Sequence, residues 1–390
     1  MRILQVHNFY QQAGGEDRVL QAEEELLTAN GHEVFQYTVH NDAVNAMPDW
    51  SLGLKTIWNG DTYAAVRRRM AEQGIALAHV HNTLPLISPA VYYAAAAQRV
   101  PVIQTLHNYR LLCPAATFYR QGAICELCSG KSIKYPAVKY RCYRGGLGAS
   151  AAVTTMLAVH RLAGTYRQRI HTYIALTEFA RGKFCADGLP AERIVVKPNF
   201  LMKDPGVGDG SGGYALFVGR LSEEKGLAAL LDAWSEGSQT IPLKIAGAGP
   251  LEKFVASRAG ELPSVEYLGH CGYERVIELL KGAVFLMLPS RWYEGMPMAV
   301  LESMACGTPV VAFGLGSLNE LIREGVNGFK LAGHDAAALA QFLKNPGELT
   351  AKCAGLRAST RAHFEAHFTA KANYPLLLGI YKRALDSIVR

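Results

Sequence analysis

Two glutamates in one short stretch are the first residues whose types and spacing could do chemistry. The stretch SRWYEGMPMAVLES, residues 290–303, carries Glu294 and Glu302 with seven residues between them. If both lay on one helix, the rise of about 1.5 Å per residue would separate them by roughly 12 Å. That exceeds the roughly 5–9.5 Å between paired carboxylates in glycoside hydrolysis, and it is too far for one metal ion. We therefore expect two arms of one elongated binding site.

A helix that begins near Pro297 would give the two carboxylates different tasks. Glu294 precedes the helix on a loop, where the free N–H groups of Gly295 and Met296 can hold an anion. Glu302 follows about two turns along, where a carboxylate can accept hydrogen bonds from two ribose hydroxyls. Hydroxyls at both ends with phosphates between them describe a nucleotide sugar.

The cations that such a ligand needs occur in the stretch FVGRLSEEKGL, residues 217–227. Arg220 ends an expected strand and Lys225 follows five residues later, so together they could neutralise a diphosphate. Glu223 and Glu224 lie between them and could pair with these cations instead, so both interpretations stay open.

Two glycine-rich turns follow expected strands. In AGGED, residues 13–17, Gly14 and Gly15 would let backbone N–H groups approach an anion at the start of a helix. In IAGAGPL, residues 245–251, Gly249 would allow close approach of the backbone to a ligand. A plain structural turn explains either stretch equally well. Neither is a G-x-G-x-x-G fingerprint, and no acidic residue ends the second strand, so no nicotinamide cofactor is predicted.

The elements that must position these residues alternate between short apolar strands and helices. This alternation predicts an α/β fold with parallel sheets, whose ligands bind at the carboxyl ends of the strands. We expect strands in the first half at residues 2–9, 32–39, 75–82, 101–108 and from 172. We expect strands in the second half at residues 215–220, 243–250, 265–270, 284–290, 308–313 and 327–331.

A stretch rich in glycine and proline, residues 198–214, separates the two halves and is typical of an interdomain linker. We therefore expect two doubly wound, Rossmann-like domains, residues 1–200 and 201–372. An amphipathic helix, residues 373–390, is interrupted at Pro375 and is expected to cross back to the first domain.

The motifs together resemble family 4 of the retaining glycosyltransferases. The stretches GRLSEEKG, IAGAGP, PSRWYEGMPMAVLESMACGTPVVA and EGVNGF carry the resemblance through residues 217–329, including the E-x7-E element. NFYQQAGGED, HVHNTLPLISP and TLHNYRLLCP extend it over nearly the whole chain. The resemblance implies the GT-B architecture, in which two Rossmann-like domains face each other across a cleft and hold a nucleotide-diphosphate sugar donor.

The resemblance also implies roles for individual residues. Arg220 and Lys225 would bind the donor diphosphate, Glu294 the transferred sugar and Glu302 the ribose. His107 would touch the donor sugar, so the expected catalytic residues are His107, Arg220, Lys225 and Glu294. The expected donor-binding residues are Gly14, Gly15, Arg220, Lys225, Gly249, His270, Glu294, Gly295, Met296, Pro297 and Glu302. The leaving phosphate would help to deprotonate the acceptor on the same face of the sugar, and no catalytic metal would be needed.

Four cysteines lie in an expected insert, residues 108–146, with the spacing C-x11-C-x2-C-x13-C. Four thiolates around a C-x2-C pair match a tetrahedral structural zinc site, which would staple an otherwise long loop. An iron–sulfur cluster, and thiols or disulfides without a metal, remain alternatives. The expected ligands are Cys113, Cys125, Cys128 and Cys142.

Positive charge is concentrated in the first half of the chain. Residues 99–200 carry 15 basic and 4 acidic side chains, a net of +11, whereas residues 201–390 carry 19 of each. This excess suits an anionic membrane surface or a phosphorylated acceptor, although a solvated basic face explains it too. The segment at residues 146–169 could rest on a membrane or form a buried helix. No recognition motif for nucleic acid accompanies the charge.

The sequence shows neither a signal peptide nor a transmembrane stretch, so we expect a cytoplasmic protein, peripheral at the inner face of the plasma membrane. The predicted activity is retaining transfer of a sugar from a nucleotide-diphosphate sugar to a lipid-linked or surface-polysaccharide precursor. A GT-B phosphorylase and a catalytically idle GT-B partner subunit are the alternatives.

Overall fold

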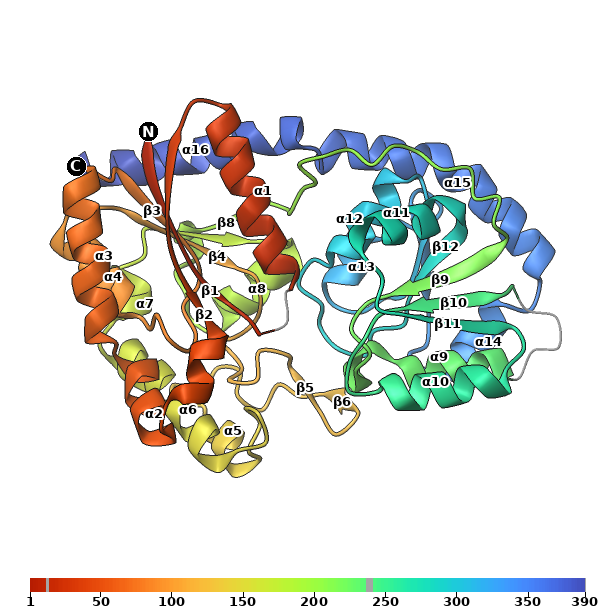
Figure 1. The fold of residues 1–390 in the computed structure, drawn as a ribbon, viewed down its shortest axis with the longest axis horizontal. Coiled ribbons are helices and arrows are strands. Elements are labelled where there is room, and N and C mark those ends of the chain that lie inside the picture. Colours follow the sequence, from red (N-terminus) through yellow and green to blue (C-terminus); the bar gives the residue numbers. More distant parts are fainter. Residues whose placement is uncertain (12–13, 236–240, 390) are drawn as a thin grey trace. The chain divides into compact units, whose positions relative to one another are not determined.

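The computed structural model describes residues 1–11, 14–235 and 241–389, and it divides into two compact units (Figure 1). Unit 1 comprises Met1–Phe118, Cys125–Met202 and Asn373–Arg390, and unit 2 comprises Tyr119–Ile124 and Lys203–Ala372. Each unit contains a six-stranded parallel sheet, which confirms the predicted fold of two α/β domains.

The sheet of unit 1 has the strand order β2-β1-β3-β4-β7-β8, and every pair in it is parallel. Its central strands β1, β3 and β4 are almost wholly buried, because helices cover both faces, so they read in the sequence as apolar runs. The strands are β1 Arg2–Phe9, β2 Glu33–His40, β3 Leu77–Asn82, β4 Val102–Leu106, β7 Thr172–Ala175 and β8 Ile194–Val196. The short strand β8 was not expected from the sequence.

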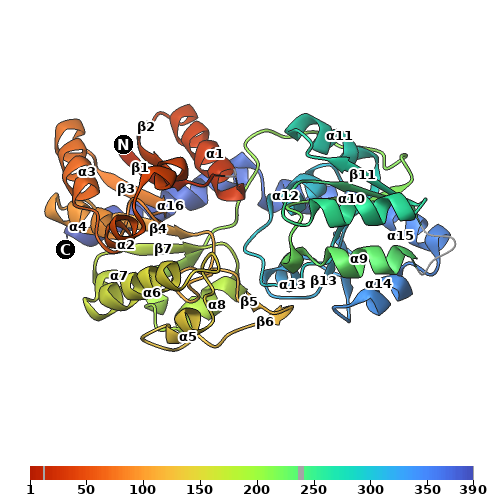
Figure 2. The ribbon, with the colours of Figure 1, turned by 60° about the horizontal axis from the view of Figure 1, so that its bottom comes forward.

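The helices of unit 1 connect these strands. The α-helices are α1 Gly15–Ala29, α2 Asp49–Ile57, α3 Gly60–Gln73, α4 Ala90–Ala97, α5 Tyr135–Lys139, α6 Leu147–Leu162, α7 Thr165–Gln168 and α8 Glu178–Ala186. Two 3-10 helices, η1 Asn41–Ala46 and η2 Ala191–Arg193, complete the set. Helix α6 packs against both α2 and α5 (Figure 2).

The sheet of unit 2 has the strand order β11-β10-β9-β12-β13-β14, again all parallel. The strands are β9 Tyr214–Val218, β10 Leu243–Ala246, β11 Val265–Gly269, β12 Ala283–Leu288, β13 Val310–Phe313 and β14 Gly328–Leu331. The helices are η3 Glu223–Lys225, α9 Leu227–Ser235, α10 Glu252–Glu261, α11 Tyr273–Gly282, α12 Met298–Ala305, α13 Ser317–Leu321, α14 Ala336–Phe342 and α15 Pro346–His367.

The last helix, α16 Ala370–Val389, contributes most of its length to unit 1. Its apolar face, with Leu377, Ile380 and Tyr381, is buried in one core cluster with residues of strands β1, β3, β4 and β7. The helix continues through Pro375, where the sequence predicted an interruption. Proline costs one backbone hydrogen bond there, and the buried apolar face keeps the helix continuous.

The cysteine-rich insert is held by one buried carboxylate. Asp187, which follows α8, accepts hydrogen bonds from Lys134 Nζ at 2.7 Å and from the backbone N–H of Gly130 at 2.6 Å. Arg161 of α6 contacts the same carboxylate. Lys134 is 1% exposed, so a charged pair bridges the insert to the rest of unit 1. The insert also forms a two-stranded hairpin, β5 Tyr119–Arg120 and β6 Ala123–Ile124, which the sequence did not predict.

Among the described residues, no helix combines the length and the apolar composition that crossing a membrane requires.

Candidate functional site

The loops that follow strands β9, β10 and β11 are tied together at the carboxyl edge of the unit 2 sheet. Leu221 N donates to Ala248 O at 2.9 Å, and Gly247 N donates to Gly269 O at 2.8 Å. Arg220 and His270 extend from this framework, and both are exposed. Among the residues that the structure describes, the Arg220 guanidinium has no ion-pair partner. Its charge is therefore available to an anion.

Steric demand explains two glycines of the β10 loop. A Cβ at Gly247 would lie 1.9 Å from Gly219 O, and one at Gly249 would lie 2.5 Å from Leu221 O. Both residues have φ values above +150°, which L side chains rarely adopt. The close approach that the sequence indicated at Gly249 is made to the chain's own backbone. A contact of Gly249 with a donor remains a prediction.

Lys225 lies against Glu294, 69 residues further along the chain. Its Nζ donates to Glu294 Oε1 at 2.7 Å, Ser290 Oγ donates to the same oxygen at 2.6 Å, and the ring of Trp292 lies 5.1 Å from the ammonium. Gly226 makes this possible, because a Cβ there would lie 1.9 Å from the oxygen of Pro289. Lys225 and Glu294, which the sequence assigned to different parts of the donor, thus contact each other at a largely buried carboxylate.

The two glutamates beside Lys225 in the sequence have other partners. Ser222 Oγ donates to Glu224 at 2.6 Å, and Tyr119 OH donates to Glu223 at 3.2 Å. The simple alternative, in which Glu223 or Glu224 pairs with Lys225, is not what the structure shows.

Helix α12 begins one residue after Pro297, close to the predicted start. Glu294, Gly295 and Met296 precede it on an extended loop, and Glu294 is 4% exposed. Glu302 lies in the second turn of α12 and is 2% exposed, and its contact with a ribose remains a prediction.

In unit 1, the glycine turn is fixed by a histidine and an aspartate. His7 of β1 lies 2.7 Å from Asp17, whose other oxygen accepts from Gly14 N at 2.8 Å. Gly14 precedes α1 and Gly15 opens it, whereas Ala13 lies outside the described residues. Among the described residues, a Cβ at Gly14 would meet Tyr10 alone, at 3.8 Å, so these surroundings do not require a glycine.

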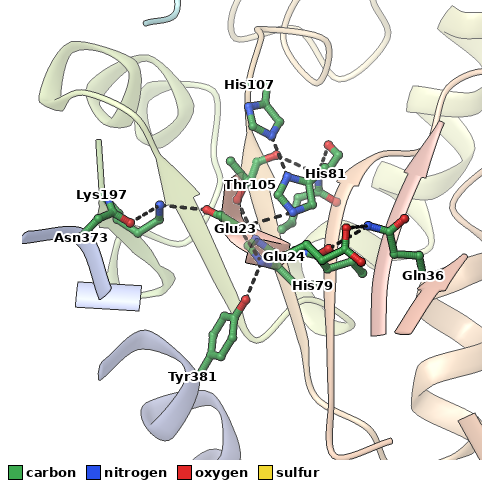
Figure 3. Close-up of polar contacts among 12 residues, drawn as sticks. Glu23, Glu24, Gln36, His79, His81, Thr105, His107, Lys197, Asn373 and Tyr381 are labelled. Carbon is green, nitrogen blue, oxygen red and sulfur yellow. Dashed lines mark hydrogen bonds and ion pairs between the residues drawn. The ribbon is translucent and has the colours of Figure 1, made fainter. Parts of the chain in front are cut away.

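His107 follows strand β4 at the carboxyl edge of the unit 1 sheet and is partly exposed. Its Nε2 lies 2.9 Å from Nδ1 of His81, and the two rings are stacked with centroids 5.2 Å apart (Figure 3). Burial holds the pKa of His107 and the pKa of His81 well below the ordinary histidine value. Both rings are therefore neutral at neutral pH.

A buried group behind His107 was missed by the sequence reasoning. Glu23 of α1 lies 2.9 Å from Lys197 Nζ, 3.2 Å from His79 and 3.5 Å from His81. A signal was present, because Glu23 falls on the helix stripe that also carries Val19, Leu20, Leu26 and Leu27. A carboxylate on an apolar stripe needs buried partners.

The four cysteines of the insert all belong to unit 1. Burial, with the neighbouring thiols of Cys113 and Cys142, raises the pKa of Cys128 to about 11. Among the described residues, the group whose metal-ligand atoms all lie within 4.8 Å of one another is Glu23, His79 and His81, and the cysteines form no such group. The thiols of Cys113 and Cys142 influence Cys128, but the described cysteines do not have the mutual spacing of a closed zinc site.

Two family models match the chain. Residues 14–199 match the model described as glycosyl transferase 4-like domain, and residues 212–345 match the model described as glycosyl transferases group 1. One match lies in the first half of the chain and the other in the second half.

Individual proteins give the same picture. An uncharacterised glycosyltransferase of Methanocaldococcus jannaschii is 34% identical over 140 residues, which are 35% of this chain and 38% of that protein. A D-inositol 3-phosphate glycosyltransferase of Catenulispora acidiphila is 29% identical over 187 residues, 44% of each chain. The chain thus spans less than half the length of these relatives.

Among solved structures, HepE of Anabaena in complex with UDP aligns over 100% of both chains, with a TM-score of 0.67 and 19% identity. At this identity the likeness shows the fold alone. The chain therefore has the GT-B fold, with one segment that matches the glycosyl transferase 4-like model and a second that matches the glycosyl transferases group 1 model.

Proposed function

We propose that the protein transfers a sugar from a nucleotide-diphosphate sugar to a hydroxyl acceptor, with retention at the anomeric carbon. The observation that carries the proposal is the contact between Lys225 and Glu294 in unit 2, with the exposed Arg220 on the connection that also carries Lys225. All three follow strands at one edge of a parallel sheet, where ligands of such folds bind. The relatives named as glycosyltransferases support the same class of reaction.

In this proposal, fixed positive charge drives the departure of the nucleotide. Arg220, Lys225 and the positive end of the α12 helix dipole stabilise the diphosphate as negative charge develops on it. These groups make a catalytic metal unnecessary, and the leaving phosphate takes the acceptor proton. Glu294, oriented by Lys225 and Ser290, accepts hydrogen bonds from the transferred sugar, and Glu302 accepts them from the ribose.

The proposal gives the remaining predicted residues supporting roles. His107 and the turn at Gly14 and Gly15 contact the donor from unit 1. Gly249 and His270 lie on the loops around Arg220 and contact the nucleotide. UDP is the first donor nucleotide to test, because HepE has been solved with UDP and with UDP-glucose.

Nucleotide binding is tested by a thermal-shift screen of UDP, GDP and ADP. One of them should raise the melting temperature, because a ligand stabilises the state that binds it. Arg220→Ala should abolish that shift and leave the unliganded melting temperature unchanged. If no nucleoside diphosphate shifts the melting temperature at millimolar concentration, the proposed donor class is wrong.

We further propose a lipid-linked acceptor and peripheral contact with the inner, anionic membrane face. Trp50 and Leu54 of α2 are 72% and 61% exposed, and Leu162 of α6 is 78% exposed. Exposed basic residues of the insert accompany them: Lys131, Lys139, Arg141 and Arg144. Apolar side chains beside cations suit an anionic bilayer. The double variant Trp50→Ser, Leu54→Ser should lower co-sedimentation with phosphatidylglycerol vesicles, and unchanged sedimentation would contradict the contact.

Finally, we propose that Cys113, Cys125, Cys128 and Cys142 hold a structural zinc ion. The mutual influence of three of the thiols supports the donor set, and zinc would favour their deprotonated forms. Binding of zinc requires the four sulfurs to move closer to one another than they are in this structure. About one zinc per purified chain, lost in Cys128→Ser, is the expected result, and zinc-free protein would contradict the proposal.

A further inference from the structure

A continuous row of buried polar groups leads from Lys197 to the partly exposed His107 (Figure 3). Lys197 Nζ donates to Glu23 Oε1 at 2.9 Å, and it also lies 3.1 Å from Oδ1 of Asn373. The other oxygen of Glu23, Oε2, faces His81 Nε2 at 3.5 Å. Nδ1 of His81 then lies 2.9 Å from Nε2 of His107. The row therefore joins a charged pair in the core to a residue at the sheet edge.

The charge in this row is fixed. Glu23 is 0% exposed and Lys197 is 1% exposed, and each supplies the charge that the other needs. The two histidines carry no charge at neutral pH, because burial lowers the pKa of each. Each ring then has one N–H group and one bare nitrogen.

The carboxylate selects which nitrogen of His81 holds the proton. With the proton on Nδ1, the bare Nε2 lone pair would face a negatively charged carboxylate oxygen at 3.5 Å, which is electrostatically unfavourable in a buried place. With the proton on Nε2, the N–H dipole lies 3.5 Å from that oxygen and is attracted by its charge, although the two atoms do not form a hydrogen bond. Nδ1 of His81 is then an acceptor, so His107 must donate from its Nε2 across the 2.9 Å contact. His107 is left with a bare Nδ1, and within the described part of the chain no hydrogen bond engages that atom.

We propose that Glu23 and His81 are positioning residues that hold His107 in the Nε2–H tautomer, so that its Nδ1 accepts a hydrogen bond from a hydroxyl of the donor sugar. The tautomer follows from the contacts within unit 1. The contact with the sugar rests on the proposed function. In the catalytic triads of hydrolases, a buried carboxylate orients one histidine in the same way. Here a second histidine, His107, follows the first.

A bound divalent metal is the competing interpretation of the same atoms. Ligands at about 2.0–2.1 Å from a tetrahedral zinc lie roughly 3.4 Å apart. Glu23 Oε2 lies 3.2 Å from His79 Nδ1 and 3.5 Å from His81 Nε2, which is close to that spacing. However, Nδ1 of His79 already lies 2.8 Å from Tyr381 OH, and Lys197 already balances the charge of the carboxylate. A dication would leave a net positive charge in the core, so the contacts favour the arrangement without a metal, in which Glu23 fixes the histidine tautomers.

Nuclear magnetic resonance on protein labelled with 15N-histidine reads the tautomers without any substrate. His107 and His81 should each show a proton on Nε2 and a bare Nδ1, and His107→Gln and His81→Gln assign the two rings. A proton on Nδ1 of His107 would overturn the proposal. So would a second zinc ion per chain that disappears in Glu23→Gln, because a metal on Nε2 of His81 excludes the proton there.

Glu23→Gln tests the role of the carboxylate, because its amide N–H can donate to His81 Nε2 and so reverse both tautomers. Glu24→Gln is the matched control, since Glu24 is the next residue and accepts from Gln36 at 2.8 Å, away from His81. If burial of an unpaired Lys197 unfolds Glu23→Gln, the double variant Glu23→Gln, Lys197→Met removes the pair together. The His107 proton should move to Nδ1 in the glutamine variant and stay on Nε2 in the control.

Hydrolysis of UDP-glucose as a probe gives the functional readout. Glu23→Gln should lower kcat by roughly tenfold or more, with the dissociation constant for UDP changed by less than about twofold. Glu24→Gln should keep the wild-type kcat. A tautomer reversal without loss of kcat would overturn the positioning role. A wild-type chain that binds no UDP and hydrolyses no UDP-glucose would instead refute the proposed donor. The tautomer measurement would still test whether Glu23 and His81 hold His107 in the Nε2–H form.

Discussion

At the scale of single residues, the candidate site combines a cation that is held and a cation that is free. Lys225 is engaged by Glu294, whereas Arg220 is exposed and has no ion-pair partner among the described residues. The held lysine also orients the carboxylate, so its loss disturbs two groups. The free arginine can be removed without leaving a buried charge behind. The two cations can therefore be distinguished experimentally.

Arg220→Ala should lower turnover of a nucleotide sugar by about 100-fold or more, since it removes a group aimed at the developing phosphate charge. Its free energy of unfolding should change by less than about 0.5 kcal/mol, as for other exposed positions. Lys225→Ala should lower turnover similarly and also cost about 1–3 kcal/mol, because Glu294 loses a partner in a largely buried place. Steady-state kinetics and urea unfolding measure both quantities. Wild-type transfer by Arg220→Ala would remove its assignment.

The buried histidines make the stability of the folded chain depend on pH. Burial lowers the pKa of His79 to about 4, from an ordinary value of 6.5, while Glu23 opposes the shift and Lys197 adds to it. The unfolded chain binds this proton more readily, so the contribution is complete above pH 6.5 and is lost as pH falls toward 4. His79 alone accounts for at most about 3 kcal/mol.

Urea unfolding at pH 7 and at pH 5 should therefore show a loss of stability that is smaller in His79→Gln than in the wild type. His40→Gln, a change at an exposed histidine, is the control and should keep the wild-type difference. An unchanged difference in His79→Gln would contradict a neutral buried His79.

At the scale of elements, short apolar runs that end in glycine or polar turns were enough to predict most strands. Strands such as β9 and β10 are short apolar runs followed by glycine turns, which is why Arg220 and Gly249 were expected at a sheet edge. Strand β8 has three residues and the β5–β6 hairpin has two per strand. These strands are too short to form a recognisable apolar run.

The sequence could not predict which charged residues pair when they lie far apart along the chain. Lys225 is flanked by two glutamates yet contacts a third, 69 residues away. Only the fold, which packs Gly226 against Pro289, determines which of the three glutamates contacts Lys225. Similarly, Lys134 finds Asp187 across 53 residues. The cysteine spacing predicted a zinc ion that holds the insert together. The stabilising contact that the structure shows is the buried ion pair of Lys134 and Asp187.

Asp187→Asn should loosen the insert. Lys134 is 1% exposed and would keep its charge without a carboxylate, which costs about 3–5 kcal/mol in buried pairs. Limited proteolysis should then cut between residues 119 and 142. Glu178→Gln, which breaks an exposed pair with Arg181, is the control and should change stability by less than about 1 kcal/mol. An insert that resists protease equally in Asp187→Asn and wild type would show that the ion pair is not the staple.

At the scale of the whole molecule, the two ends of the chain meet in one core. Ile3 of β1 belongs to the same buried cluster as Leu377, Ile380 and Tyr381 of α16. Asn373 and Tyr381 of this helix also contact Lys197 and His79, which both lie against the buried Glu23. The last residues therefore complete the domain that begins with the first ones. Unit 1 requires the C-terminal helix for its core and for its buried polar contacts.

Leu377→Ala should therefore destabilise unit 1 by about 2–5 kcal/mol, because it empties a fully buried position between the helix and the sheet. Leu376→Ala is the matched control, since this neighbouring leucine is 46% exposed and should cost less than about 1 kcal/mol. Tyr381→Phe removes only the hydroxyl against His79 and should fall between them, at about 1 kcal/mol. Urea unfolding followed by hydrogen exchange locates the effect, because strands β1, β3 and β4 should lose protection while strands of unit 2 keep it. Equal stability of Leu377→Ala and Leu376→Ala would show that the helix does not complete the core of unit 1.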